Sequence, residues 1–230
     1  MPTVKLPDGS TLEVAEGSRV ADVANQIGPR LAKAAVAARL DGKLVDLSTV
    51  LEGEGERSLE ILTDKSDEAL SILRHSTSHV MAEAVRRLYG DVRFGIGPSI
   101  EDGFYYDFDL ADRITEDDFE RIEAEMAKIV EVAEPFVRTE RPVAEVRSEM
   151  ESAGQWCKVE LLDDIAAQGL AEGEEIENAD AKPVPDAPGR VSLYETGDFV
   201  DLCRGPHLPD AGRIPTFKLL SVSGSYWRGD

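Results

Sequence analysis

The chain has 230 residues, a hydrophobic fraction of 42% and a formal net charge of −21. This length suits one large domain or two ordinary ones, and the apolar content is sufficient for a folded core, which excludes a disordered chain. Two cysteines exclude a disulfide framework, and no apolar run approaches the length of a membrane span. We therefore expect a cytoplasmic protein with no membrane partner.

The acidity argues against general nucleic-acid binding, which depends on neutralising phosphates. However, the charge is uneven: segment 101–131 holds 12 acidic and 3 basic residues, whereas segment 70–100 holds four arginines against one Glu and one Asp. Contact with a phosphate backbone is therefore still possible around segment 70–100.

Residues 1–64 have the element order of a small β-grasp, or ubiquitin-like, domain. Apolar residues alternate on both sides of two turns, Pro7-Asp-Gly9 and Asp41-Gly42, and Gly28-Pro29 ends a short helix capped by Ser18. Such domains more often dock or space other parts than catalyse. The predicted elements are a hairpin over 4–14, a helix over 20–27, a second hairpin over 35–47 and a strand over 58–63.

Residues 65–230 are predicted to form a larger α+β domain with a mostly antiparallel sheet. A long helix begins near Ser66 or Asp67 and ends at Gly90, with His75 and His79 beside an apolar stripe that includes Leu70. The other predicted elements are two strands within 92–109, a helix over 119–130, a helix from Pro142, an exposed acidic loop over 171–190, and strands over 191–194, 199–202 and 217–222.

Two pairs of potential metal ligands stand out, His75 with His79 and Cys203 with His207, which together contain all 3 histidines and one of the 2 cysteines. Residues four apart share a face of a helix, so the first pair projects together. Two pairs about 125 residues apart form one site only through the fold. The ligand set matches tetrahedral zinc, structural or catalytic, and the alternative is a group of buried, hydrogen-bonded histidines.

Two further residues favour hydrolytic chemistry. Asp201 precedes Cys203 by two positions, so on a strand the two side chains share a face. Lys158 stands in an aromatic and apolar stretch that predicts partial burial of its ammonium group. Histidines, Asp201 and Lys158 in one cleft would orient a water molecule and hold a developing oxyanion. Cys203 as a nucleophile would need a partner base and a lowered pKa.

Five motifs resemble bacterial threonyl-tRNA synthetases. They are Arg-His-Ser-Thr-Ser-His at 74–79, Gly-Ile-Gly-Pro at 95–98, Asp-Gly-Phe-Tyr-Tyr-Asp at 102–107, Asp-Leu-Cys-Arg-Gly-Pro-His-Leu-Pro at 201–209 and Tyr-Trp-Arg-Gly-Asp at 226–230. The resemblance covers essentially the whole chain: residues 1–64 resemble the TGS domain of this family and residues 65–230 its editing domain. The class II catalytic core would begin after residue 230. ATP, Mg²⁺ and one zinc ion are therefore implied for the parent enzyme, and no cofactor for these residues.

The resemblance implies a function in two parts. The parent enzyme joins threonine to its tRNA with ATP, and this part hydrolyses the seryl-tRNA that forms by error. One methyl group gives only about 1–3 kcal/mol of discrimination in a binding pocket, so a second, hydrolytic site is needed. The implied partners are the 3′ aminoacyl end of threonine tRNA and its serine moiety. The parent is expected to be a homodimer through its core, and the fragment a monomer.

The resemblance also implies residue roles. Lys158 and His75 would position water and the hydroxyls of the terminal ribose, whereas Asp201 and His207 would hold the amine and hydroxyl of serine. It implies no metal ligand, because the family's editing site is generally taken to work without zinc. Ser78 departs from the family, in which a small apolar residue is usual. The full implied set is His75, His79, Lys158, Asp201, Cys203 and His207 as catalytic residues, with Tyr106, Gly97 and Arg204 against the substrate.

Two alternatives are kept. The first is a freestanding hydrolase of misacylated tRNA, complete at 230 residues, although the abrupt end of the chain and the TGS-like part favour a fragment. The second is a zinc-stabilised RNA-binding module without enzymatic activity.

Overall fold

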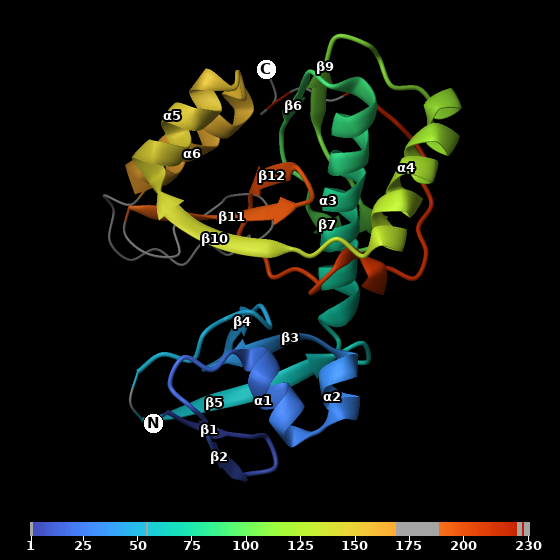
Figure 1. Cartoon of the computed structure of the whole chain (residues 1–230). Helices are drawn as coiled ribbons and strands as arrows, with labels where there is room; N and C mark the ends of the chain where they lie inside the picture. Colours follow the sequence, from blue (N-terminus) through green and yellow to red (C-terminus); the bar gives the residue numbers. More distant parts are fainter. Residues whose placement is uncertain (1, 54, 169–188, 225–226, 228–230) are drawn as a thin grey trace. The chain divides into compact units, whose positions relative to one another are not determined.

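The structure is a computed structural model that describes residues 2–53, 55–168, 189–224 and 227 (Figure 1). It contains two compact units. The first comprises residues 1–73 and 205–209, and the second comprises residues 74–204 and 210–230. The predicted domain boundary after residue 64 stays a prediction.

The first unit is built on a five-stranded sheet with the order β2-β1-β5-β3-β4. β1 runs parallel to β5, and the other neighbours are antiparallel. This is the β-grasp arrangement predicted from the sequence. The strands are β1 (Thr3–Lys5), β2 (Thr11–Glu13), β3 (Ala35–Leu40), β4 (Lys43–Val45) and β5 (Glu56–Thr63).

Helix α1 (Val20–Ile27) covers this sheet and buries Val20, Val23 and Ala24 in its core. Gly28 ends α1 as predicted. Pro29 then opens a second short helix, α2 (Pro29–Ala34), which was not predicted. A proline is well suited to the first position of a helix, because its missing N–H would have no partner there.

Residues 205–209 group with this first unit, and they carry His207. The His207 side chain is 1% exposed, and its backbone N–H donates a hydrogen bond of 3.0 Å to Oδ1 of Asp46, which is 8% exposed. A buried carboxylate of the β-grasp unit thus fixes the backbone of this segment.

The second unit contains an antiparallel sheet with the order β10-β11-β12. Two adjacent helices pack on it, so that Val146 of α5, Leu162 of α6 and Leu193 of β11 share one core (Figure 1). β10 and α6 were not predicted. The elements are β10 (Val137–Pro142), α5 (Val143–Ser152), α6 (Trp156–Gln168), β11 (Arg190–Thr196) and β12 (Phe199–Leu202).

The long helix α3 (Ala69–Tyr89) lies mostly in the second unit, beside α4 (Phe119–Val132) (Figure 1). Every residue of α3 from Ser76 to Val85 is buried, polar ones included. Leu70, which was predicted to face the core, is 52% exposed, whereas Ala69 and Ile72 of the same turn are buried. The helix predicted over 119–130 is confirmed as α4, and it buries Ile122, Met126 and Ile129.

Two sequence predictions need correction. Segment 92–109 forms four short strands instead of two, since β6 pairs with β9 and β7 pairs with β8. Residues 217–222 form no strand, and the Leu219 N–H instead donates to a carboxylate oxygen of Glu123. The predicted loop over 171–190 lies mostly outside the described residues. The short strands are β6 (Val92–Phe94), β7 (Ser99–Ile100), β8 (Gly103–Phe104) and β9 (Phe108–Leu110).

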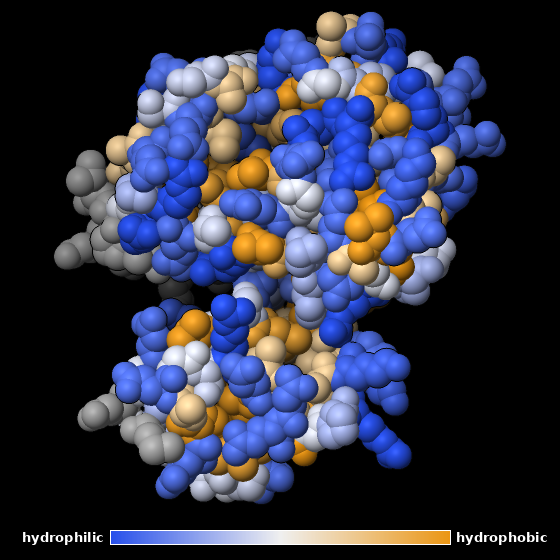
Figure 2. All heavy atoms as spheres, viewed as in Figure 1, coloured by the Kyte–Doolittle hydropathy of each residue, from blue (hydrophilic) through white to orange (hydrophobic). Residues whose placement is uncertain are grey.

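Helices and mostly antiparallel sheets occur in both units, which confirms the predicted α+β class. On the face shown in Figure 2, hydrophilic residues cover most of the surface of each unit, and hydrophobic residues form small separate groups. None of the helices within the described ranges has the length and apolar character needed to cross a membrane.

Candidate active site

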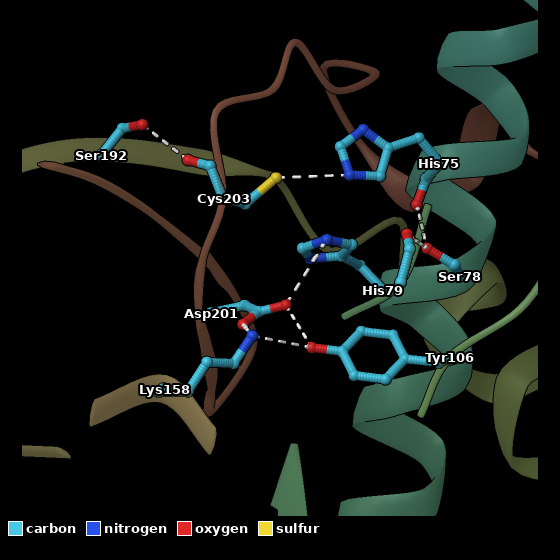
Figure 3. Close-up of polar contacts among 9 residues, drawn as sticks. His75, Ser78, His79, Tyr106, Lys158, Ser192, Asp201 and Cys203 are labelled. Atoms are coloured by element: carbon cyan, nitrogen blue, oxygen red, sulfur yellow. Dashed lines mark hydrogen bonds and ion pairs between the residues drawn. The ribbon is translucent and has the colours of Figure 1, made fainter. Parts of the chain in front are cut away.

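Four separate elements of the second unit bring polar side chains together (Figure 3). Helix α3 supplies His75 and His79, and the segment between β8 and β9 supplies Tyr106. Helix α6 supplies Lys158 from its first turn. Strand β12 supplies Asp201, and Cys203 follows directly after it. The fold therefore joins residues that are separated by up to 128 positions in the sequence.

Asp201 is at the centre of a buried network. Its Oδ1 lies 2.5 Å from the ammonium nitrogen of Lys158, and its Oδ2 accepts a hydrogen bond of 2.5 Å from the Tyr106 hydroxyl. Nε2 of His79 lies 3.5 Å from the same Oδ2. All four side chains are buried. A buried charge is tolerated only when it is paired and hydrogen-bonded, which is the arrangement around Asp201.

The protonation states follow from this environment. Burial would raise the pKa of Asp201, but the Lys158 ammonium and the surrounding hydrogen bonds hold it below its usual value, so the carboxylate is ionised at neutral pH. Burial and the Asp201 charge raise the pKa of Tyr106 well above its usual value, which keeps its hydroxyl as a donor. Burial lowers the pKa of His79 to about 3 despite the attraction of Asp201, so its imidazole is neutral.

His75 and Cys203 lie above this network and are only half-buried. Nε2 of His75 is 3.3 Å from the Cys203 sulfur, and the His75 and His79 rings meet edge to face at 5.0 Å (Figure 3). Because the other members are buried, these two are the most exposed side chains of the group.

Gly97 and Ser78 fix the wall of the site. A Cβ atom on Gly97 would lie 2.2 Å from the ring of Tyr106, so only glycine allows the ring to approach this closely. The Ser78 hydroxyl lies 2.6 Å from the Gly97 carbonyl oxygen and 2.7 Å from that of His75. Its single proton can be donated to one of them at a time. The hydroxyl of Ser78 thus ties α3 to the loop that carries Gly97.

The remaining predicted residues are placed differently. The Arg204 side chain is exposed, and its carbonyl oxygen accepts a bond of 3.5 Å from the Tyr194 hydroxyl. His207 groups with the first unit, so its meeting with the other site residues stays a prediction. Sequence analysis missed Ser192, which fixes Cys203 through a hydroxyl bond of 2.6 Å and a backbone bond of 3.2 Å. An isolated serine on a strand gives no signal of such a role.

Three of the potential metal ligands, all in the second unit, lie near one another. Ligand atoms of His75, His79 and Cys203 lie within 4.8 Å of one another. Nitrogen and sulfur ligands of tetrahedral zinc lie about 3.3–3.8 Å apart, at bond lengths of about 2.0–2.3 Å. However, His79 also lies beside Asp201, whose carboxylate is already neutralised by Lys158.

Comparison with known proteins finds matching domain families and relatives that are similar over the whole chain. Residues 2–63 match the TGS domain, and residues 191–228 match the threonyl and alanyl tRNA synthetase second additional domain. A threonine–tRNA ligase of Pelobacter propionicus is 47% identical over 99% of this chain. One of Rubrobacter xylanophilus is 47% identical, and threonine–tRNA ligase 1 of Bacillus subtilis 44% identical, both over 100% of the chain.

The chain matches the N-terminal part of threonine–tRNA ligases. It spans about a third of the length of these relatives, namely 32% in each of the three. Within this part of the ligase, the TGS match falls on the β-grasp, and the second match covers β11, β12 and the Cys203 motif.

Replacing Gly97 with alanine is expected to displace Tyr106 from Asp201. Forcing one methyl group into this contact should destabilise the second unit by about 1–3 kcal/mol. Chemical denaturation followed by fluorescence of Trp156 and Trp227, which both belong to this unit, measures the change. Gly103→Ala is the matched control, because a Cβ atom there meets open space, and it should change stability by less than about 0.5 kcal/mol. Equal stabilities of the two variants would contradict the close approach.

Proposed function

We propose that this chain carries the editing site of a threonine–tRNA ligase and that the site hydrolyses seryl-tRNA made in error by the parent enzyme. The observation that carries the proposal is the ionised, buried Asp201, which is held by Lys158 and Tyr106 directly beneath the half-buried His75 and Cys203. The match to the second additional domain supports the same assignment. The parent would ligate threonine to tRNA with ATP and Mg²⁺, with one zinc ion in its core, and act as a homodimer.

The proposed reaction is the attack of water on the ester carbonyl. His75 takes a proton from the water as its oxygen bonds to the carbonyl carbon, and the same proton then passes to the ribose oxygen as the ester bond breaks. The products are free serine and tRNA. Lys158 keeps N–H donors beyond the one that pairs with Asp201, and these can stabilise the oxyanion. Asp201 retains lone pairs that can accept from the amine or hydroxyl of serine.

Discrimination against threonine would come from the tight wall formed by Gly97, Tyr106 and Ser78. Serine and threonine differ by one methyl group, and attractive contacts alone separate them by about 1–3 kcal/mol. The contact between Gly97 and Tyr106 has no space for one added Cβ atom, and a wall packed this closely would reject the larger side chain by a clash. The exposed Arg204 would contact the phosphates of the 3′ end of the tRNA. The cytoplasmic location and the monomeric state of the fragment stay predictions.

The fragment is expected to deacylate seryl-tRNA of the threonine type and to spare threonyl-tRNA. Hydrolysis of the two radiolabelled esters is compared at equal enzyme concentration, after subtraction of spontaneous hydrolysis. A rate for the seryl ester at least about 100-fold above that for the threonyl ester is expected. Equal rates would contradict the sieve, and no hydrolysis of either ester would favour the RNA-binding alternative.

His75→Ala is expected to lower the rate of deacylation by about 10²–10³-fold, because it removes the proposed base while leaving the buried network intact. Lys158→Met should cost a similar factor through the lost cation. Since this variant leaves Asp201 buried and unpaired, the double variant Lys158→Met with Asp201→Asn tests activity in a neutral site. Lys43→Met on the exposed strand β4 is the control. Near wild-type rates in the first two variants would refute the assigned roles.

We propose further that the site needs no metal. A zinc ion held by His75, His79 and Cys203 would lower the pKa of a bound water. However, Lys158 already supplies a positive charge to Asp201, 3.5 Å from the same His79, and it would repel a dication. The purified fragment should therefore hold substoichiometric zinc by elemental analysis and keep its deacylation rate after chelator treatment. One zinc per chain, with activity lost to the chelator and restored by zinc, would reverse this assignment.

A further inference from the structure

A second buried polar cluster lies further along α3, outside the site described above. His75, His79, Glu83 and Arg87 follow one another at intervals of four residues, so they form a single polar row that winds slowly around the helix. The first two belong to the candidate active site. Glu83 is 0% exposed, and the proposed hydrolysis does not use it.

Arg87 faces more carboxylates than it can neutralise. Its guanidinium lies 2.5 Å from Oε1 of Glu83, 2.7 Å from Oε1 of Glu134 and 3.5 Å from Oε1 of Glu125. Glu125 has a second cationic partner, Lys128, at 2.7 Å. The remaining pair, Glu83 and Glu134, thus shares one cation. Glu83 is fully buried and Glu134 is 15% exposed, and two carboxyl groups this close to a single guanidinium favour a proton on one of them.

The pKa of Glu83 agrees with one cation being shared by two carboxyl groups. Burial raises the pKa of Glu83 to about 8, the Arg87 charge opposes this, and Glu134 adds to it through its charge and a hydrogen bond. Among the described residues, no N–H or O–H group donates to Oε2 of Glu83 or to Oε2 of Glu134, although both atoms are buried. A neutral carboxyl group carries such a buried oxygen at lower cost than a carboxylate does.

The turn between β11 and β12 closes over this pair. A Cβ atom on Gly197 would lie 2.2 Å from Oε2 of Glu134, 2.4 Å from Oε1 of Glu83 and 3.0 Å from Nη2 of Arg87. Gly197 also has a φ of +55°, which favours glycine. The neighbouring charged residues in the sequence, Arg86 of α3 and Asp198 of the turn, lie 4.0 Å from each other. Four residues after Gly197, β12 presents Asp201 to the candidate active site.

We infer that Glu83 is a positioning residue: the proton that it shares with Glu134 holds the β11–β12 turn against α3 and so fixes Asp201 beside His79. Loss of this proton places two adjacent carboxylates under Gly197, and their repulsion pushes the turn away. The expected effect on catalysis rests on the proposed editing function, whereas the sharing of a proton between Glu83 and Glu134 does not.

The sign of the pH dependence follows from linkage. A carboxyl group with an ordinary pKa near 4.5 when unfolded and about 8 when folded gives stability that is fully present below pH 4.5. That stability is lost as the pH rises toward 8. Glu83→Gln keeps the shape and the donor toward Glu134 but cannot ionise. The stability of the wild type should therefore equal that of Glu83→Gln at pH 5 and fall below it at pH 9.

The experiment compares the wild type, Glu83→Gln and the control Glu131→Gln, which removes one exposed charge from α4. The Tm of the wild type should fall below that of Glu83→Gln by at least about 4 °C at pH 9 and equal it at pH 5, whereas Glu131→Gln follows the wild type. Amide hydrogen exchange of residues 196–199 should be faster in the wild type than in Glu83→Gln at pH 9 only. If Glu83→Gln does not fold, Glu134→Gln replaces it, because it also removes the repulsion.

Deacylation of seryl-tRNA supplies the catalytic readout, after correction for spontaneous hydrolysis. At pH 9 the wild type should be about tenfold slower than Glu83→Gln, and at pH 7 the two should be equal. If the Tm values of the wild type and Glu83→Gln change in parallel with pH, the shared proton is refuted, whatever the rate of deacylation. Diverging Tm curves with identical pH–rate profiles would overturn the positioning of Asp201. Diverging Tm and exchange data with no deacylation at any pH would support the shared proton and refute the proposed function.

Discussion

The ion pair between Lys158 and Asp201 is the interaction on which the second unit's functional region depends. It joins the first turn of α6 to β12 in a place where neither charge has access to water. An isolated charge in such a position is very unfavourable, so each partner requires the other. Tyr106 and His79 complete the shell of Asp201, and α6, β12, α3 and the segment before β9 are thereby held in one arrangement.

The burial of this pair also separates two kinds of side chain within the site. The charged and hydrogen-bonded groups that set the electrostatics lie inside, whereas His75 and Cys203 lie half-buried in front of them. A preorganised charge costs no reorganisation when a substrate binds, and this is the usual basis of transition-state stabilisation by enzymes. The neutral state of His79 fits the same division, because a second cation beside Lys158 would weaken the field of Asp201.

Helix α3 links the two buried polar clusters of this unit. Its row from His75 to Arg87 begins at the candidate active site and ends at the carboxyl pair under the β11–β12 turn. The same hairpin contacts both ends of the row, through Gly197 at one end and Asp201 at the other. A helix of 21 residues with polar side chains buried along it is conformationally specific, since each buried group has to find its partner.

The sequence by itself determined the β-grasp, the helices α1, α3, α4 and α5, and the two motif pairs, because periodicity, caps and turn residues are local signals. It did not reveal β10, which has a polar sequence and is a strand only because β11 pairs with it. It predicted a strand over 217–222, but these residues form none, and the Leu219 N–H donates to Glu123 instead. Propensity and alternation indicate that a segment can pair, but the tertiary structure decides whether it has a partner.

For the site, the residue types could be read from the sequence, whereas only the fold decided what each one contacts. The four-residue spacing placed His75 and His79 on one face, and the resemblance pointed to Lys158, Asp201 and Tyr106. That the lysine is ion-paired, the tyrosine a donor and His79 neutral follows from burial, which depends on contacts between residues far apart in the sequence. For the same reason, the sequence did not distinguish Glu83 from an ordinary helix residue. Its distinctive property, a shared proton, exists only where Glu134, Arg87 and Gly197 meet.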